Sequence, residues 1–163
     1  MNITAKQFFQ LNLTEIVRKN LSETGLDPKY LELEITESMT VDVERAITTF
    51  NDLKKTGVKI SIDDFGTGYS SLLYLKKFPI DRLKVDQSFI RDSITDSHDE
   101  SIVKTIFEMA HNLHLQVIGG GVETKEHVSF LVEQMCMEAK RYYFSKPNRF
   151  LNLNLISSYE NRW

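Results

Sequence analysis

Short apolar runs alternate along this chain with longer segments of helical periodicity, and this alternation limits the fold more than any other feature. Five runs are rich in Val, Ile, Leu or Tyr and too short for helices; they are residues 31–36, 58–63, 83–86, 116–119 and 141–145. Residues 1–3 are a possible further strand. Strands separated by helices in this rhythm predict an α/β fold with a parallel sheet and helical crossovers.

Four segments between these runs predict helices, because their apolar side chains recur at helical spacing. They are residues 13–24, 43–56, 99–114 and 125–135. Gly25 and Gly57 follow the first two and suit helix C-termini. We therefore expect about six strand–helix units. A doubly wound sheet and a β/α barrel both fit this number; a full barrel usually has eight units and about 250 residues, so a barrel here would be incomplete.

Composition narrows the class of protein. The chain has 163 residues, of which 41% are hydrophobic and 26% charged, as in soluble globular domains. Its net charge of -3 gives no reason to expect a nucleic-acid polymer as partner. Cys136 is the single cysteine, so no intrachain disulfide can form, which fits a cytoplasmic location. No apolar stretch approaches the roughly 18 residues that a membrane span needs.

Charged residues gather at the predicted strand ends, where parallel α/β folds place their chemistry. They are Glu34, Glu37, Asp63, Asp64, Lys84, Asp86 and Glu123. Carboxylates that converge from several strands repel one another unless a cation lies between them. Oxygen ligands suit Mg²⁺ or Mn²⁺, and a neighbouring lysine could orient a phosphate or an attacking water. The pattern therefore indicates a metal-dependent site.

A structural role for these residues is the alternative. One carboxylate after a strand is usually a helix N-cap, and this is the better interpretation of Glu37, Asp86 and Glu123 taken singly. The doublet Asp63-Asp64 is different, because Gly66 and Gly68 follow it closely. Two glycines at this spacing suggest unusual backbone angles or close approach to a ligand, although a plain turn fits the spacing nearly as well.

Five blocks of sequence belong together: LEITES at 33–38, DDFGTGYSS at 63–71, LKVD at 83–86, GVET at 121–124 and FSKP at 144–147. In their order and spacing they resemble the EAL-domain family of cyclic-di-GMP phosphodiesterases. The resemblance covers about residues 1–147. It implies a β/α barrel, here without its first strands, and a two-metal site that cleaves one phosphodiester bond of cyclic-di-GMP.

The resemblance also implies roles for single residues. Asn2, Glu34 and Asp63 match metal-ligand positions, and Asp64 matches the position at the second metal. Lys84 matches the lysine that holds the attacking water, and Glu37 matches the glutamate that anchors the loop after the aspartate doublet. Glu123 matches the second glutamate of the family's Glu-Gly-Val-Glu run.

Several positions depart from the family. The Glu-Ala-Leu signature is absent, and with it a metal-ligating glutamate and an arginine that contacts substrate. Gly120 stands where the family has the glutamate that serves as metal ligand or general base. Lys140 replaces a glutamine, and Arg141 the glycine after it. Loss of a general base alone costs about 10²–10⁴ in rate, and loss of ligands lowers metal occupancy, so Mg²⁺ or Mn²⁺ binding is expected to be weak or absent.

These departures predict a degenerate EAL domain that acts as an interaction or regulatory module without phosphodiesterase activity. The alternatives are a fragment of a larger active cyclic-di-GMP phosphodiesterase, against which Gly120 argues, and a non-catalytic cyclic-di-GMP receptor. Lys140 is a candidate for supplying the missing positive charge, with drift at an unused site as the equal alternative. The missing strands predict a homo-oligomer or a protein partner that covers the open barrel. The divergent tail, residues 148–163, is expected to form a helix.

Overall fold

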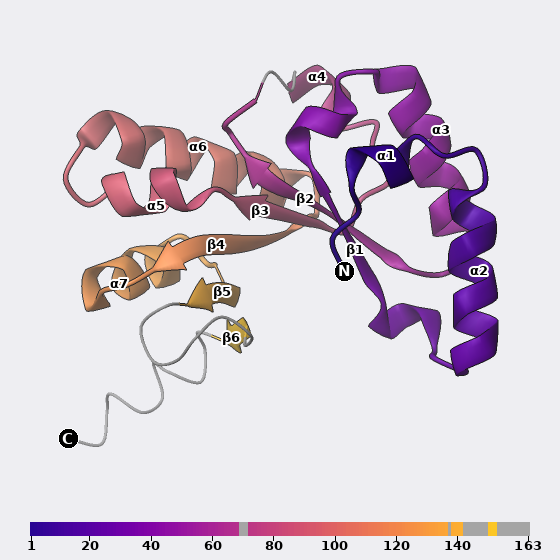
Figure 1. The fold of residues 1–163 in the computed structure, drawn as a ribbon. Helices are drawn as coiled ribbons and strands as arrows, with labels where there is room; N and C mark the ends of the chain where they lie inside the picture. The colour runs from indigo at the N-terminus through magenta and orange to yellow at the C-terminus, as the bar shows by residue number, and fades with distance from the viewer. Residues whose placement is uncertain (69–71, 137, 142–149, 153–163) are drawn as a thin grey trace. The chain divides into compact units, whose positions relative to one another are not determined.

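The computed structural model describes residues 1–68, 72–136, 138–141 and 150–152. They confirm the α/β class: helices and strands alternate along the chain (Figure 1). The chain forms two compact units, Met1–Arg82 and Leu83–Trp163. In the described part of the chain no helix is both long enough and apolar enough to cross a membrane.

The first unit is built around two parallel strands. Its elements are α1 (Ala5–Phe8), α2 (Leu13–Thr24), η1 (Pro28–Tyr30), β1 (Glu32–Thr36), η2 (Glu37–Thr40), α3 (Val43–Lys54), β2 (Lys59–Phe65) and α4 (Leu72–Leu75). β1 and β2 pair in parallel, from Glu32 opposite Lys59 to Thr36 opposite Asp63. The strand predicted at residues 1–3 is a single bridge from Asn2 to Glu34.

Burial of one sheet face and one aromatic cluster stabilises this unit. Leu33 and Ile35 of β1, together with Ile60 and Ile62 of β2, are 0% exposed. The ring of Phe50, from α3, lies 5.5 Å from that of Phe8 and 5.3 Å from that of Phe78, measured between centroids. α3 begins where the Asp42 carboxylate accepts a hydrogen bond from the Arg45 amide, and the chain reverses at Gly57, whose φ is +88°. Ala46, Phe50 and Leu53 form the buried face of α3, at the helical spacing that the sequence predicted.

The second unit continues the alternation. Its elements are β3 (Arg82–Val85), α5 (Gln87–Asp92), α6 (Ser97–Asn112), β4 (Gln116–Val122), α7 (Lys125–Glu133), β5 (Glu138–Arg141) and β6 (Phe150–Asn152). The strands follow one another in the sheet in chain order. β4 pairs with β5 in parallel and β5 with β6 antiparallel. Helices α5, α6 and α7 all contact β4 (Figure 1).

The last two predicted elements need correction. The strand predicted at residues 141–145 begins earlier, at Glu138, because its ladder with β4 starts where Ile118 faces Glu138; residues 142–145 lie outside the described residues. The helix predicted for the tail is wrong at residues 150–152. They form a strand because they pair with β5, with Asn152 opposite Glu138. The remaining tail residues, 148–149 and 153–163, lie outside the described part.

Candidate functional site

Three of the predicted site residues share one face of the β1–β2 ladder. Register partners in a sheet point to the same side, as do residues two apart along a strand. Glu34 is paired with Asn2 on one side and with Ser61 on the other, and Asp63 lies two residues beyond Ser61. Asn2, Glu34 and Asp63 therefore point from neighbouring backbone segments to the same side of the sheet. Each brings a side-chain oxygen, as a hard divalent cation requires.

A tight turn follows Asp63. The Asp63 carboxylate accepts a hydrogen bond from the Asp64 amide at 3.0 Å. Asp64 has a φ of +56°, in the left-handed region that few residues other than glycine, asparagine and aspartate adopt. Its carbonyl accepts from the Thr67 hydroxyl at 2.9 Å, and Gly66 has a φ of +104°. The doublet thus lies within the last three residues of β2, where Asp64 has a strained backbone angle and is exposed.

Glu37 holds the start of the loop after this turn. One of its carboxylate oxygens accepts hydrogen bonds from the backbone amides of Gly66 and Gly68, each at 2.9 Å. Glu37 is only 3% exposed. A Cβ on Gly68 would lie 2.9 Å from the Glu37 carboxyl carbon, so the close approach requires glycine there. The contact fits the loop anchor that the resemblance assigned to Glu37.

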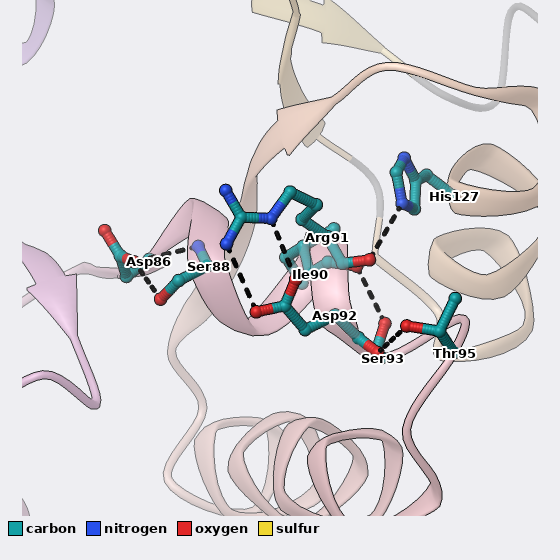
Figure 2. A network of polar contacts seen from close by, with 8 residues as sticks. All are labelled: Asp86, Ser88, Ile90, Arg91, Asp92, Ser93, Thr95 and His127. Atoms are coloured by element: carbon teal, nitrogen blue, oxygen red, sulfur yellow. Dashed lines mark hydrogen bonds and ion pairs between the residues drawn. The ribbon is translucent and has the colours of Figure 1, made fainter.

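In the second unit, the end of β3 leads directly into α5. Lys84 on β3 is 3% exposed, so its ammonium lies within the protein interior. Asp86 is the N-cap of α5, and its carboxylate accepts hydrogen bonds from both the amide and the hydroxyl of Ser88 (Figure 2). For Asp86, the helix-cap interpretation is therefore confirmed.

Gly120 packs against the junction between β3 and α5. A Cβ added to Gly120 would lie 2.9 Å from the Val85 carbonyl oxygen and 3.2 Å from the Gln87 amide nitrogen. Both atoms belong to backbone, which cannot rotate away as a side-chain end can. The position therefore has no side chain and no room for one without movement of the backbone.

Glu123 lies just beyond β4, in the turn that begins α7. Its amide and that of Thr124 both donate to Nδ1 of His127, each at 3.3 Å. Glu123 is exposed, whereas His127 is 4% exposed. The pKa of the Arg91 guanidinium is raised, chiefly by its hydrogen bonds to Asp92 and further by the Glu123 and Asp86 carboxylates. Arg91 and His127 therefore belong to the surroundings of Glu123, and the sequence analysis missed both.

Comparison with known proteins identifies the family. The family model described as "EAL domain" matches residues 1–147. The chain belongs to the EAL domain family. The predicted resemblance is confirmed over the range expected.

Relatives and solved structures agree with this assignment. The signaling protein YkoW of Bacillus subtilis is 45% identical over 148 residues, which are 90% of this chain and 18% of that protein. The cyclic di-GMP phosphodiesterase NbdA of Pseudomonas aeruginosa is 43% identical over 90% of this chain and 19% of its own length. The chain thus spans about a fifth of these relatives.

Among solved structures, the PaMucR phosphodiesterase in complex with c-di-GMP has a TM-score of 0.86 and 40% identity, over 90% of this chain and 60% of that chain. The EAL domain of Mycobacterium smegmatis DcpA has a TM-score of 0.83 and 35% identity, over 97% and 70% respectively. The chain therefore adopts part of the EAL fold, as the prediction of an incomplete barrel requires.

The positions that the family resemblance assigns to metal ligands differ in what they could offer a metal. Asn2, Glu34 and Asp63 share one sheet face and would be the residues to hold Mg²⁺ or Mn²⁺. Gly120 can offer no ligand. Among the described residues, no three His, Cys, Asp or Glu side chains are grouped closely enough to hold a metal ion. The convergence of the two units' residues on one site stays a prediction. So does the substitute role of Lys140, whose backbone lies in β5 and whose side chain is outside the described part.

Proposed function

We propose that this chain is a degenerate EAL domain of bacterial cyclic-di-GMP signalling that does not hydrolyse the dinucleotide and acts as an interaction or regulatory module. The observation that carries the proposal is Gly120. It replaces the carboxylate that serves the EAL family as metal ligand or general base, and the Val85 carbonyl oxygen lies 2.9 Å from where its Cβ would be. Gly120 therefore supplies neither a metal ligand nor a general base.

Product analysis tests the loss of hydrolysis. The purified chain is incubated with cyclic-di-GMP and Mn²⁺, and the linear dinucleotide is separated by chromatography. We expect none above a protein-free control. Turnover that disappears in Glu34→Ala or Asp63→Ala would contradict the proposal, because these variants remove oxygen donors from the shared face of β1 and β2. That result would instead favour a cyclic-di-GMP phosphodiesterase.

Nucleotide binding without hydrolysis is the second candidate. Two observations favour it: Asn2, Glu34 and Asp63 remain together on one sheet face, and the similar PaMucR structure is described as a c-di-GMP complex. Calorimetry with cyclic-di-GMP, with and without Mn²⁺, separates the candidates. Binding that requires Mn²⁺ and is lost in Asp63→Ala would make the chain a receptor. Absence of binding heat in both titrations would favour the interaction module.

Oligomerisation or a protein partner completes the proposal. The solved PaMucR phosphodiesterase contains chain beyond the region matched here, since the match covers 60% of it. We propose that a second copy or a protein partner covers the corresponding surface, and that the module works in the cytoplasm, where the lone Cys136 stays reduced. Light scattering coupled to gel filtration tests the first part: a monodisperse monomer across a concentration series counts against self-association.

A further inference from the structure

His127 contacts the ends of two helices through its two ring nitrogens; Figure 2 shows the contact of Nε2 with Arg91. On one side it is the third residue of α7 and completes a capping box with the N-cap Thr124. The Thr124 hydroxyl accepts from the His127 amide at 3.3 Å, and Nδ1 of the ring accepts from the Thr124 and Glu123 amides. On the other side, Nε2 lies 3.4 Å from the Arg91 carbonyl oxygen in α5.

These contacts suit one tautomer of the ring. Two backbone N–H groups point at Nδ1, so this nitrogen must carry a lone pair. A carbonyl oxygen faces Nε2, so that nitrogen must carry the proton. The contacts therefore match a neutral ring with its proton on Nε2, and His127 is 4% exposed.

The Arg91 carbonyl belongs to a helix end where side-chain donors supplement the backbone hydrogen bonds to the last carbonyls. The last carbonyls of a helix have no partner within it. In α5 the Ser93 hydroxyl donates to the Ile90 carbonyl at 2.8 Å, and the Thr95 hydroxyl donates to that of Asp92 at 3.2 Å (Figure 2). His127 serves the carbonyl between them, from 36 residues along the chain. It thereby ties the C-terminus of α5 to the turn that carries Glu123.

We propose that His127 is a proton-sensitive latch, which holds the Glu123 turn against α5 while its ring is neutral and releases the turn when Nδ1 is protonated. A capping box normally uses glutamate or glutamine at this position, and both retain an acceptor oxygen near neutral pH. A protonated imidazole has two donors and no acceptor. It would place an N–H against the two amides, and a positive charge at a helix N-terminus, where the helix dipole disfavours it.

Other charges around the ring do not reverse this preference. Lys125 on α7 and Arg91 on α5 are cations and oppose protonation. Glu123, Glu126 and Asp92 are anions and favour it, and the Coulombic attraction of His127 is among the smaller causes that lower the pKa of Glu126. These carboxylates lie at the surface, where solvent screens them. None of them can accept the two amide hydrogens in place of Nδ1, so the cap is lost on protonation whatever their charge.

Hydrogen exchange tests the latch, with wild type, His127→Gln and His127→Ala compared at about pH 8 and about pH 5, on either side of the ordinary histidine titration. Rates at the Glu123 and Thr124 amides are corrected for the intrinsic effect of pH. Because a cap contributes about a factor of five in local stability, we expect about fivefold less protection in His127→Ala at both pH values. Wild type should fall to that level only at about pH 5, and His127→Gln should keep its protection at both.

Nitrogen NMR of the ring gives an independent reading that does not depend on any variant folding. At about pH 8 we expect Nδ1 to resonate as the unprotonated nitrogen. A proton on Nδ1, equal protection of wild type and His127→Gln at about pH 5, or full protection in His127→Ala would each overturn the proposal. None of these measurements involves cyclic-di-GMP, so the latch and the proposed function stand or fall separately.

Discussion

Adding one methyl group at Gly120 tests how tightly β4 packs on the junction between β3 and α5. The alanine Cβ would lie 2.9 Å from the Val85 carbonyl oxygen and 3.2 Å from the Gln87 amide nitrogen. Overpacking of this kind typically costs about 1–3 kcal/mol. Gly120 does not have a positive φ, so alanine also gains about 0.4–1 kcal/mol by restricting the unfolded chain. We expect a net loss of about 1–2 kcal/mol in the free energy of unfolding.

Gly119 provides the matched control, because it lies in the same strand and also lacks a positive φ. A Cβ there would meet the Leu131 methyl groups, at 2.8 and 3.0 Å. These are the ends of a side chain that can rotate, so Gly119→Ala should cost less than Gly120→Ala. Gly121→Ala should cost most of the three, since Gly121 has a φ of +66° and its Cβ would lie 2.5 Å from that of Gln87.

Urea unfolding, followed by circular dichroism, measures the loss of stability in each of the three glycine variants. With a slope of about 1–3 kcal/mol per molar urea, a loss of 2 kcal/mol moves the midpoint by about 1 M. A Gly120→Ala midpoint equal to or above that of Gly119→Ala would refute the close packing. It would also remove the structural support for the idea that a glutamate cannot simply be restored at this position.

Three further predictions concern other parts of the chain. Phe50→Ala should lower the free energy of unfolding by about 3–5 kcal/mol, measured in urea, because a fully buried ring is replaced by a cavity between Phe8 and Phe78. Glu37→Ala should cost about 1–3 kcal/mol in the same assay by leaving the Gly66 and Gly68 amides without their acceptor; Glu37→Gln, which keeps one acceptor oxygen, should cost clearly less, and equal losses would contradict the anchoring role. Burial raises the pKa of the Cys136 thiol from 9.0 to about 11, so alkylation at about pH 8 should be slow in the folded chain and fast in urea, and stability should fall as pH rises from 9 towards 11, because the unfolded thiol loses its proton first.

The sequence predicted best those elements whose signals are local. Residues 13–24 were predicted as a helix that stops at Gly25, and α2 has these bounds with Gly25 in the left-handed conformation. β4 was predicted to end at Gly119 but runs to Val122, because glycine carries no strand propensity and the pairing with β5 decides instead. The strand at 150–152 likewise depends on a partner distant in sequence, which periodicity cannot reveal.

At the candidate site, residue types were readable and their contacts were not. Gly66 and Gly68 after the doublet Asp63-Asp64 indicated unusual backbone angles, and Gly66 has a positive φ, as does Asp64. The loop-anchoring hydrogen bonds of Glu37 followed only from family resemblance. His127 was missed, although Thr124 three residues before it is a capping-box signal; histidine in place of glutamate or glutamine concealed the motif.

Two of the residues at family positions have side-chain contacts that bear on the interpretation of function. Glu37 holds the loop after β2, and the Asp63 carboxylate accepts from the next amide. Both side chains contribute to local structure whether or not phosphodiester bonds are cleaved, so their presence alone does not argue for turnover. Gly120 differs, because a side chain there would crowd the backbone, and the family resemblance implies a chemical role for the carboxylate at this position. Under the proposed function, a chain that does not need to hydrolyse cyclic-di-GMP would be expected to keep residues with structural contacts, such as Glu37, and to lose a carboxylate at position 120.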